Sequence, residues 1–425
     1  MSTEHGTSGA PWNTAEQHAE IAVPPGDLAG GITAARGYRA AGVHCGVKKA
    51  KKDLCLLVSD VPATGAAVLT TNRVQAAPVL VVRHQLNAGS TFRALVVNSG
   101  NANACTGERG MKDAWMMAGA TARALGISPN EVLVSSTGVI GQFLPIDKIV
   151  AGIGAAALGL SPAEGTAAAE AIMTTDTFVK ETAVRCELHG VPVTIGGMAK
   201  GSGMIAPNMA TMLAFVTTDA AVAPALLHRA LVGATNRSFN RISVDGDMST
   251  NDMAVVLANG MSRATPLTDA GDPAFALFCH ALEEVLVRLA KMIVMDGEGA
   301  TKFIEINVVG AASEEAATAA ARAIANSSLV KTAMHGEDAN WGRILAAVGT
   351  CGIAFDPADT EIWFGDVPIL RRNYWIDFSE TAARSALEQK DIRVTVKLHQ
   401  GEAGATFWTC DLSKEYVAIN ANYRT

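Results

Sequence analysis

The amino-acid sequence predicts a layered fold of the α/β or α+β class, in which helices cover mixed β-sheets. Two patterns carry this prediction. Stretches with helical periodicity alternate with short apolar runs, typical of buried strands, along both halves of the chain. Residues 184–188 and 191–195 also flank His189-Gly190, which indicates an antiparallel hairpin. At 425 residues the chain is long for one core, so we expect two or more core-bearing halves.

The first 210 residues hold most of the predicted strands. A polar tail, residues 1–36, precedes them and is expected to be mobile. Residues 98–105 are rich in turn formers, which predicts a loop. Helices are expected at 112–125, which Gly126 stops, and at the alanine-rich segments 146–158 and 162–173. Strands are expected at 42–46, 54–58, 67–69, 79–82, 95–97, 132–134, 184–188 and 191–195.

The same alternation continues after residue 211. The apolar run 211–216 predicts a buried strand that follows a glycine-containing loop. Residues 303–308 and 392–398 alternate between apolar and polar side chains, as half-buried strands do. A strand is also expected at 255–257, and helices are expected at 224–235, 275–292 and 314–325.

Bulk composition argues against several classes of protein. Hydrophobic residues make up 49% of the chain and charged residues 18%, which is typical of a globular protein. A formal charge of −7 argues against a general nucleic-acid surface. Seven widely spaced cysteines without a Cys-x-x-Cys pair argue against a disulfide framework and favour a reducing cytoplasm. Neither a signal peptide nor a membrane-spanning apolar stretch is expected.

Residues 200–216 carry the strongest sign of chemistry. Gly201 and Gly203 permit positive φ and close backbone approach, which a reactive peptide bond or a ligand needs. Thr211 opens the apolar run, and a threonine hydroxyl needs an adjacent base to act as a nucleophile. Cleaving the chain just before Thr211 would free an α-amine of pKa about 8, which can serve as that base. The alternative is an ordinary glycine-rich loop before a buried strand.

Other polar segments lie where a site could form. Thr137-Gly138 follows a predicted strand and offers a hydroxyl and an unhindered N–H to an oxyanion, or else marks an ordinary strand exit. The hydroxyl-rich segment around Thr174 has the composition of a helix cap, and Glu298 lies in a predicted tight turn. Asn420 and Thr425 would ordinarily belong to a frayed chain end.

These segments together resemble the glutamate N-acetyltransferase (ornithine acetyltransferase) family. Residues 200–219, KGSGMIAPNMATMLAFVTTD, are similar to the segment in which members of that family cleave their own chain. The family cuts between the alanine and the threonine of Met-Ala-Thr-Met-Leu, which here is the bond Ala210–Thr211. VLVSSTGVIGQFLP, TTDT, DGEGATK, LVVNSGNANACTG, KTAMHGEDANWGRI and the chain end NANYRT also match, so the resemblance reaches from about residue 37 to residue 425.

The resemblance implies a role for each matching residue. Thr211 would be the nucleophile, and Thr137 and Gly138 would form the oxyanion hole. Lys200 and Glu298 would bind substrate, since a cation suits a carboxylate and a carboxylate suits an amino group. The other substrate-binding positions would be Thr174, Thr211, Asn420 and the terminal Thr425. The matching segment 240–252 receives no role, and its likeness to a calcium loop fails because Thr250 replaces the required glycine.

The resemblance further implies an αββα-type sandwich made of an α chain, residues 37–210 behind the tail, and a β chain, residues 211–425. Two copies of each would form a heterotetramer. Thr211 would take the acetyl group from N2-acetylornithine and pass it to glutamate, without a metal or another cofactor. Use of acetyl-CoA as a second donor stays open, as does the choice between arginine biosynthesis and a specialised pathway.

Two other classes of function stay open at this point. A related autoprocessed amidohydrolase or aminopeptidase would transfer the acyl group to water instead of glutamate. A non-catalytic binding protein would use the same pocket with an intact chain and without a covalent acetyl-threonine. Partners other than small molecules and the paired chains, such as nucleic acid or membrane, are not expected.

Overall fold

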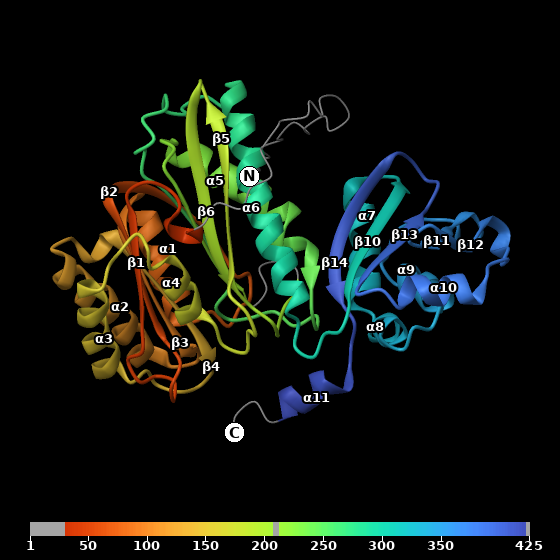
Figure 1. Ribbon diagram of the computed structural model, residues 1–425, viewed down its shortest axis with the longest axis horizontal. Coiled ribbons are helices and arrows are strands. Elements are labelled where there is room, and N and C mark those ends of the chain that lie inside the picture. The colour runs from red at the N-terminus through yellow and green to blue at the C-terminus, as the bar shows by residue number, and fades with distance from the viewer. Residues whose placement is uncertain (1–29, 207–211, 422–425) are drawn as a thin grey trace, which may run out of the picture.

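A computed structural model describes residues 30–206 and 212–421 of the protein (Figure 1). Within these ranges two β-sheets organise the chain, one of eight strands and one of six. Both sheets contain parallel as well as antiparallel pairs. The predicted layered α/β fold with mixed sheets is therefore confirmed. Residues 1–29 of the predicted tail, residues 1–36, fall outside the described residues, whereas Gly31–Thr33 form a buried 3₁₀-helix.

The larger sheet is built from both sides of residue 211. Its strands follow the order β4-β3-β2-β9-β7-β6-β5, and β1 pairs with β2. β7 and β9, which come after residue 211, lie between β2 and β6, which come before it. The strands are β1 (Tyr38–Val43), β2 (Leu54–Leu69), β3 (Thr91–Asn101), β4 (Val132–Val139), β5 (Lys180–Leu188), β6 (Val191–Lys200), β7 (Leu213–Thr218) and β9 (Met253–Ala258).

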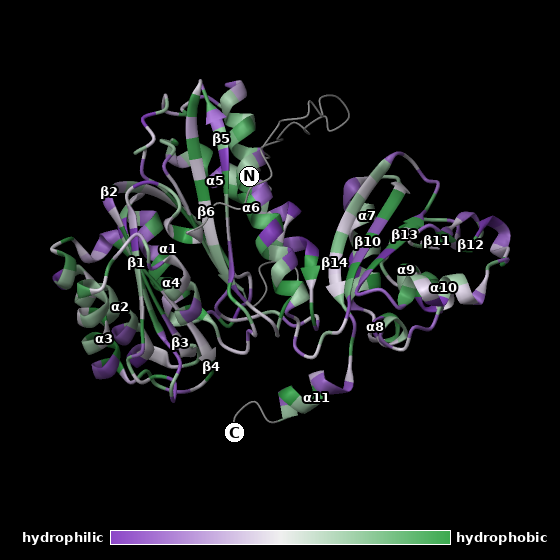
Figure 2. Cartoon of the chain, in the orientation of Figure 1, coloured by the Kyte–Doolittle hydropathy of each residue, from purple (hydrophilic) through white to green (hydrophobic). Residues whose placement is uncertain are grey.

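Helices cover both faces of the larger sheet because its central strands are apolar on both faces. In β7, Leu213 and Phe215 join one hydrophobic core, whereas Ala214 and Val216 join the other. Figure 2 shows hydrophobic residues running along these strands and along the helices beside them. The first core is closed by α1 (Ala77–Ala88), α2 (Gly107–Leu125), α3 (Ile146–Leu158) and α4 (Gly165–Ile172), and the second by α5 (Pro224–Arg237) and α6 (Pro273–Met295).

The predicted hairpin is confirmed and brings the chain to the site. β5 and β6 pair antiparallel, from Leu188↔Val191 to Lys180↔Ala199. The two turn residues between them, His189 and Gly190, have φ of 51° and 76°. Positive φ at both positions is what a two-residue hairpin loop needs to match the twist of the strands.

The smaller sheet forms the other half of the molecule. Its strands follow the order β12-β11-β13-β10-β14-β8, and a third hydrophobic core lies between this sheet and its helices. α6 contacts β5 and β6 on one side and β14 and β8 on the other, so it joins the two halves (Figure 1). The elements are β8 (Ile242–Ser243), β10 (Phe303–Ala311), β11 (Glu361–Phe364), β12 (Val367–Leu370), β13 (Asp391–Lys397), β14 (Ala403–Cys410), α7 (Glu314–Asn326), α8 (Ser328–His335), α9 (Trp341–Gly349), α10 (Glu380–Leu387) and α11 (Lys414–Ala421).

Some of the predicted elements were wrong. Residues 79–82 lie in helix α1, because Pro78 begins a helix and a short apolar run does not distinguish a strand from a buried helix. Residues 98–101 extend strand β3 instead of forming a loop, since β4 pairs with them. β1 ends at Val43 instead of continuing to residue 46, and α4 begins at Gly165 instead of at residue 162. None of the described helices is long and apolar enough to cross a membrane.

Candidate active site

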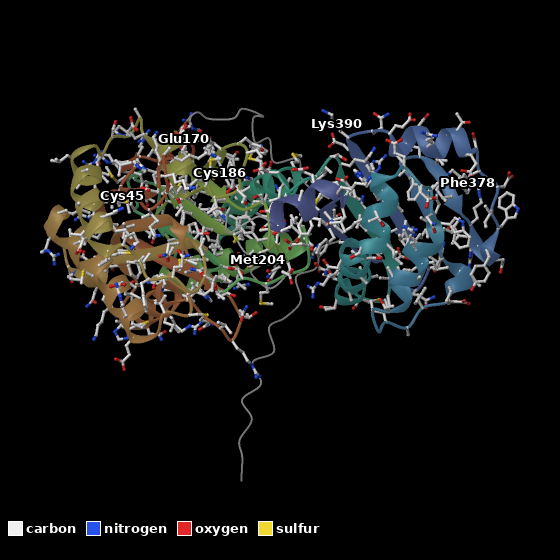
Figure 3. All side chains as sticks on the ribbon, turned by 90° about the horizontal axis from the view of Figure 1, so that it is seen from below. Cys45, Glu170, Cys186, Met204, Phe378 and Lys390 are labelled. Atoms are coloured by element: carbon white, nitrogen blue, oxygen red, sulfur yellow. The ribbon has the colours of Figure 1, made fainter. Side chains whose placement is uncertain are left out.

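A cavity of about 280 Å³ collects the predicted site residues that the structure describes. It lies at the end of the larger sheet where β4 and β6 finish, and α11 contributes one of its walls. Met204, which also lines it, is found in Figure 3 where the two halves of the molecule meet. The predicted residues that line the cavity are Thr137, Gly138, Thr174, Lys200, Glu298 and Asn420.

The first wall is the end of strand β4. Parallel pairing aligns Thr137 with Ser99 and Gly138 with Gly100 of β3. Gly138 has a φ of 134°, and a Cβ at this position would lie 2.2 Å from the carbonyl carbon of Gly100. Only glycine fits there without moving β3. The wall therefore places the buried Thr137 next to the backbone of Gly138 in the cavity lining, and the oxyanion role of both residues stays a prediction.

Lys200, the last residue of β6, supplies a buried cation. Lys200 is only 3% exposed. Burial lowers the pKa of the Lys200 ammonium, while the negative charges of Asp176, Asp252 and Glu298 act in the opposite direction. Gly201 follows with a φ of 151°, which lets the chain turn away directly after the lysine.

Glu298 supplies a carboxylate to the same cavity. Its backbone N–H donates to the carbonyl of Ser202 at 2.8 Å, and its Oε2 accepts a hydrogen bond from Asn420 Nδ2 at 2.8 Å. A Cβ at Gly203 would lie 2.4 Å from Oε2, so the glycine makes room for the carboxylate. The residue is 9% exposed. The predicted tight turn thus places an anion in the cavity that already holds Lys200.

Thr174 and Asn420 come from segments whose local sequence predicted only a cap and a frayed end. Thr174 follows α4, and its N–H donates to Asp176 Oδ2 at 2.8 Å. Asn420 lies on α11, and Tyr416 of this helix donates its hydroxyl to Asp245 Oδ2 at 3.1 Å. The chain end is therefore a helix held against the cavity and not a frayed segment up to residue 421.

The segment before β9, for which the sequence predicts no role, forms a further wall of the cavity. Ser249, Thr250 and Asn251 line the cavity. Asn251 Nδ2 donates to the carbonyls of Ala102 at 2.7 Å and Ser136 at 2.8 Å, so it ties this segment to the ends of β3 and β4. A run of polar residues directly before a buried strand was the available signal in the sequence.

Asp252 continues this wall into the protein interior. Its Oδ1 accepts the N–H of Met212 at 3.0 Å, and its Oδ2 has no hydrogen-bond partner among residues 30–206 and 212–421. Burial raises the pKa of Asp252 well above its usual range, although the Met212 N–H and Lys200 oppose the shift. The carboxyl group is thus bonded to Met212, the residue that precedes β7 and follows the predicted nucleophile Thr211 in the sequence.

Three of the predicted positions lie outside the described residues: Ala210, Thr211 and Thr425. Their roles stay predictions. Within residues 30–206 and 212–421, no group of three His, Cys, Asp or Glu side chains is arranged to hold a metal ion. The described cavity combines three features: a buried cation, a buried carboxylate, and hydrogen-bond donors from hydroxyl groups and the backbone. This set suits an amino acid that carries an acyl group.

Related proteins are known from both sequence and structure. A sequence model of the ArgJ family matches residues 39–425. The arginine biosynthesis bifunctional protein ArgJ of Symbiobacterium thermophilum is 55% identical over 401 residues, which cover 94% of this chain and 99% of that protein. The protein of the same name from Caldanaerobacter subterraneus subsp. tengcongensis is 51% identical over 402 residues, with coverage of 94% and 99%. The crystal structure of ornithine acetyltransferase complexed with ornithine, from Mycobacterium tuberculosis, is 43% identical and covers 43% of this chain and 97% of that chain, with a TM-score of 0.40.

Proposed function

The chain belongs to the ArgJ family, and from this premise we propose that it is an autoprocessing acetyltransferase that moves the acetyl group of N2-acetylornithine to glutamate in arginine biosynthesis. The observation that carries the proposal is the single cavity that holds Lys200, Glu298 and the Thr137-Gly138 backbone together. A cation and a carboxylate can orient the α-carboxylate and an amino group of an amino acid. The neighbouring donors can then stabilise the oxyanion of acyl transfer.

The proposed reaction is a double displacement. Thr211 Oγ, with its own α-amine as base, attacks the acetyl carbonyl, and Thr137 and Gly138 stabilise the tetrahedral oxyanion. The C–N bond to ornithine breaks, and the ammonium formed from the base returns a proton to the leaving amine. The α-amine of glutamate then attacks acetyl-Thr211 and releases the threonine hydroxyl. We propose that acetyl-CoA can also charge Thr211, by the same attack with a thiol as leaving group.

The strand order supports the expectation that the two chains stay associated after cleavage at Ala210–Thr211. β7 and β9 of the proposed β chain lie between β2 and β6 of the proposed α chain, joined by hydrogen bonds on both sides. Separating the chains would expose both hydrophobic cores of the larger sheet. A heterotetramer with two copies of each chain, located in the cytoplasm, completes the proposal.

The test uses acetyl-labelled N2-acetylornithine with purified enzyme and glutamate. We expect labelled N-acetylglutamate and no labelled acetate beyond a blank, whereas labelled acetate as the main product would identify an amidohydrolase. Thr211→Ala is expected to remain one uncut chain of 44.0 kDa without acetyl transfer. Two fragments or normal transfer in that variant would contradict the assignment of the nucleophile.

A further inference from the structure

A buried cluster of charges lies directly behind the cavity walls. Lys180 begins β5, and its side chain has no exposed surface. Its ammonium lies 2.7 Å from Asp176 Oδ1 and 2.5 Å from Asp296 Oδ2. We call these three residues the buried triad. They are not among the residues that line the cavity.

Asp176 holds two of the cavity walls by their backbones. Its Oδ2 accepts the N–H of Thr174 at 2.8 Å. Its Oδ1 accepts the N–H of Gly201 at 2.7 Å, and Gly201 is the residue after Lys200. One carboxylate therefore fixes where the Thr174 segment lies relative to the end of β6.

Asp296 holds the third wall. It accepts the N–H of Thr177 at 3.0 Å and also the Thr177 hydroxyl, and it lies two residues before Glu298. The hydroxyls of Thr175 and Ser202 lie 2.6 Å apart and close the contact between the same segments. The segments that carry Thr174, Lys200 and Glu298 thus meet at Lys180, the cation that bridges the two carboxylates.

The charges of the cluster also act on Lys200. In a buried region each charge is stable only with an opposite charge close to it. Asp176 acts on both lysines, and Asp296 is bonded to Lys180. Because Asp296 neutralises Lys180, the negative charge of Asp176 can still stabilise the protonated form of Lys200.

Other charged groups also face Lys200. Burial favours its neutral form, and the positive charges of Lys180 and of Lys48 act in the same sense. Asp252 and Glu298 act against them, together with Asp176. The protonation of Lys200 is therefore set by a small number of fixed charges, of which the triad contributes two directly, those of Asp176 and Lys180.

We propose that the buried triad is a positioning device for the reaction: it aligns the three wall segments and keeps Lys200 positively charged to receive a substrate carboxylate. The inference rests on the proposed function of the cavity. Lys180 and Asp296 are positioning residues, because they act through the walls and through Lys200.

Two variants with opposite charge changes test the proposal. Asp296→Asn leaves Lys180 to compete for Asp176, so Lys200 should lose its proton at a lower pH. Lys180→Met removes the competing cation, so Lys200 should keep its proton to a higher pH. We would measure KM and kcat for N2-acetylornithine, and the Kd of ornithine by calorimetry, from about pH 6 to about pH 10.

In Asp296→Asn we expect KM to begin rising at a lower pH than in the wild type and to exceed the wild-type value about tenfold at the alkaline end. In Lys180→Met the rise should move to higher pH. The double variant Lys180→Met/Asp296→Asn removes one charge of each sign and should return toward the wild-type profile. If one single variant fails to fold, the direction of the shift in the other single variant still decides the question.

The matched control is Glu170→Gln, which removes one negative charge from an exposed ion pair with Lys52, 2.7 Å long (Glu170 is labelled in Figure 3). Its pH profile should equal that of the wild type. Profiles that shift in the same direction in both single variants, or that do not shift at all, would overturn the inference and leave the proposed function intact. A wild-type protein that neither binds ornithine nor transfers acetyl would refute the proposed function, and the inference with it.

Discussion

Two clusters of side chains, each built on a buried carboxylate, hold different parts of this fold. The triad around Lys180 holds loops that line the cavity. In the smaller-sheet half, Asp411 accepts the N–H groups of Thr301 and Lys302 at 2.7 and 2.8 Å, and His335 Nδ1 lies 2.7 Å from its Oδ2. These bonds tie the end of β14 to the start of β10 and the end of α8, away from the cavity. Buried charge alone therefore does not identify a functional site. The site is identified by the backbone segments that the buried charge holds in place.

The most damaging change on the cavity side should be Gly138→Ala. The added Cβ would meet the backbone of Gly100 at 2.2 Å, so the oxyanion wall must move. We expect acetyl transfer to fall about 10²- to 10³-fold, the effect of losing one oxyanion donor. Steady-state kinetics measures it, with Gly154→Ala as control, since a Cβ at Gly154 of α3 meets nothing within 4 Å. A wild-type rate in Gly138→Ala would remove this residue from the proposed site.

Lys200→Met should have the next largest effect, and mainly on binding. Losing a charge-assisted hydrogen bond costs about 1.5–3 kcal/mol, which is a fall in kcat/KM of about 10- to 100-fold. Because the lysine is proposed to contact the carboxylate of substrate and product alike, KM should rise more than kcat falls. A loss confined to kcat would instead indicate a role in the chemical step.

Asp411→Asn should separate stability from activity. Burial would raise the pKa of Asp411, but hydrogen bonds from Thr301, His335 and Lys302 outweigh it and leave the pKa below its usual value. A lowered pKa stabilises the folded state fully above the unfolded pKa of about 4, and this stabilisation is lost as the pH falls from there through the lower pKa of the folded state. We expect a loss of about 1–3 kcal/mol in the free energy of unfolding at neutral pH.

Urea unfolding as a function of pH measures this difference, which should shrink as the solution is acidified from the unfolded pKa through the lower folded pKa of Asp411. Acetyl transfer by the folded variant should match the wild type. If Asp411→Asn changed kcat/KM as strongly as Lys200→Met does, the contrast between the two clusters would be wrong.

The smallest effect is expected for Glu283→Gln on the surface. Glu283 pairs with Arg237 at 2.6 Å, and the side chains are 24% and 46% exposed. Exposed pairs of this kind contribute about 0–1 kcal/mol. Neither unfolding in urea nor acetyl transfer should change beyond that amount, and a larger change in transfer would show that the α5–α6 surface affects the site.

The sequence predicted the cavity far better than it predicted the triad. Thr137, Lys200 and Glu298 lie in local motifs that resemble a known family, so each could be named without a structure. Lys180 and Asp296 are 116 positions apart, and their contact exists only because β5 and the end of α6 meet in the fold. No local pattern encodes such a pairing.

The smaller sheet was also predicted incompletely, for a related reason. β11 and β12 are four residues long, and β8 is two residues long. Strands this short carry little periodicity, and their pairing partners decide whether they form. The apolar run 79–82, which belongs to the other half of the molecule, is likewise too short for its pattern to distinguish a strand from the helix that it forms.

The account depends most on Thr211 carrying the acetyl group, and peptide mapping by mass spectrometry tests this directly. The mature protein would be mixed briefly with N2-acetylornithine without glutamate, quenched in acid and digested. We predict a second chain that begins Thr-Met-Leu and carries one acetyl group on its first residue, and glutamate added before the quench should remove it. An intact chain, or an acetyl group on any other residue, would contradict the account.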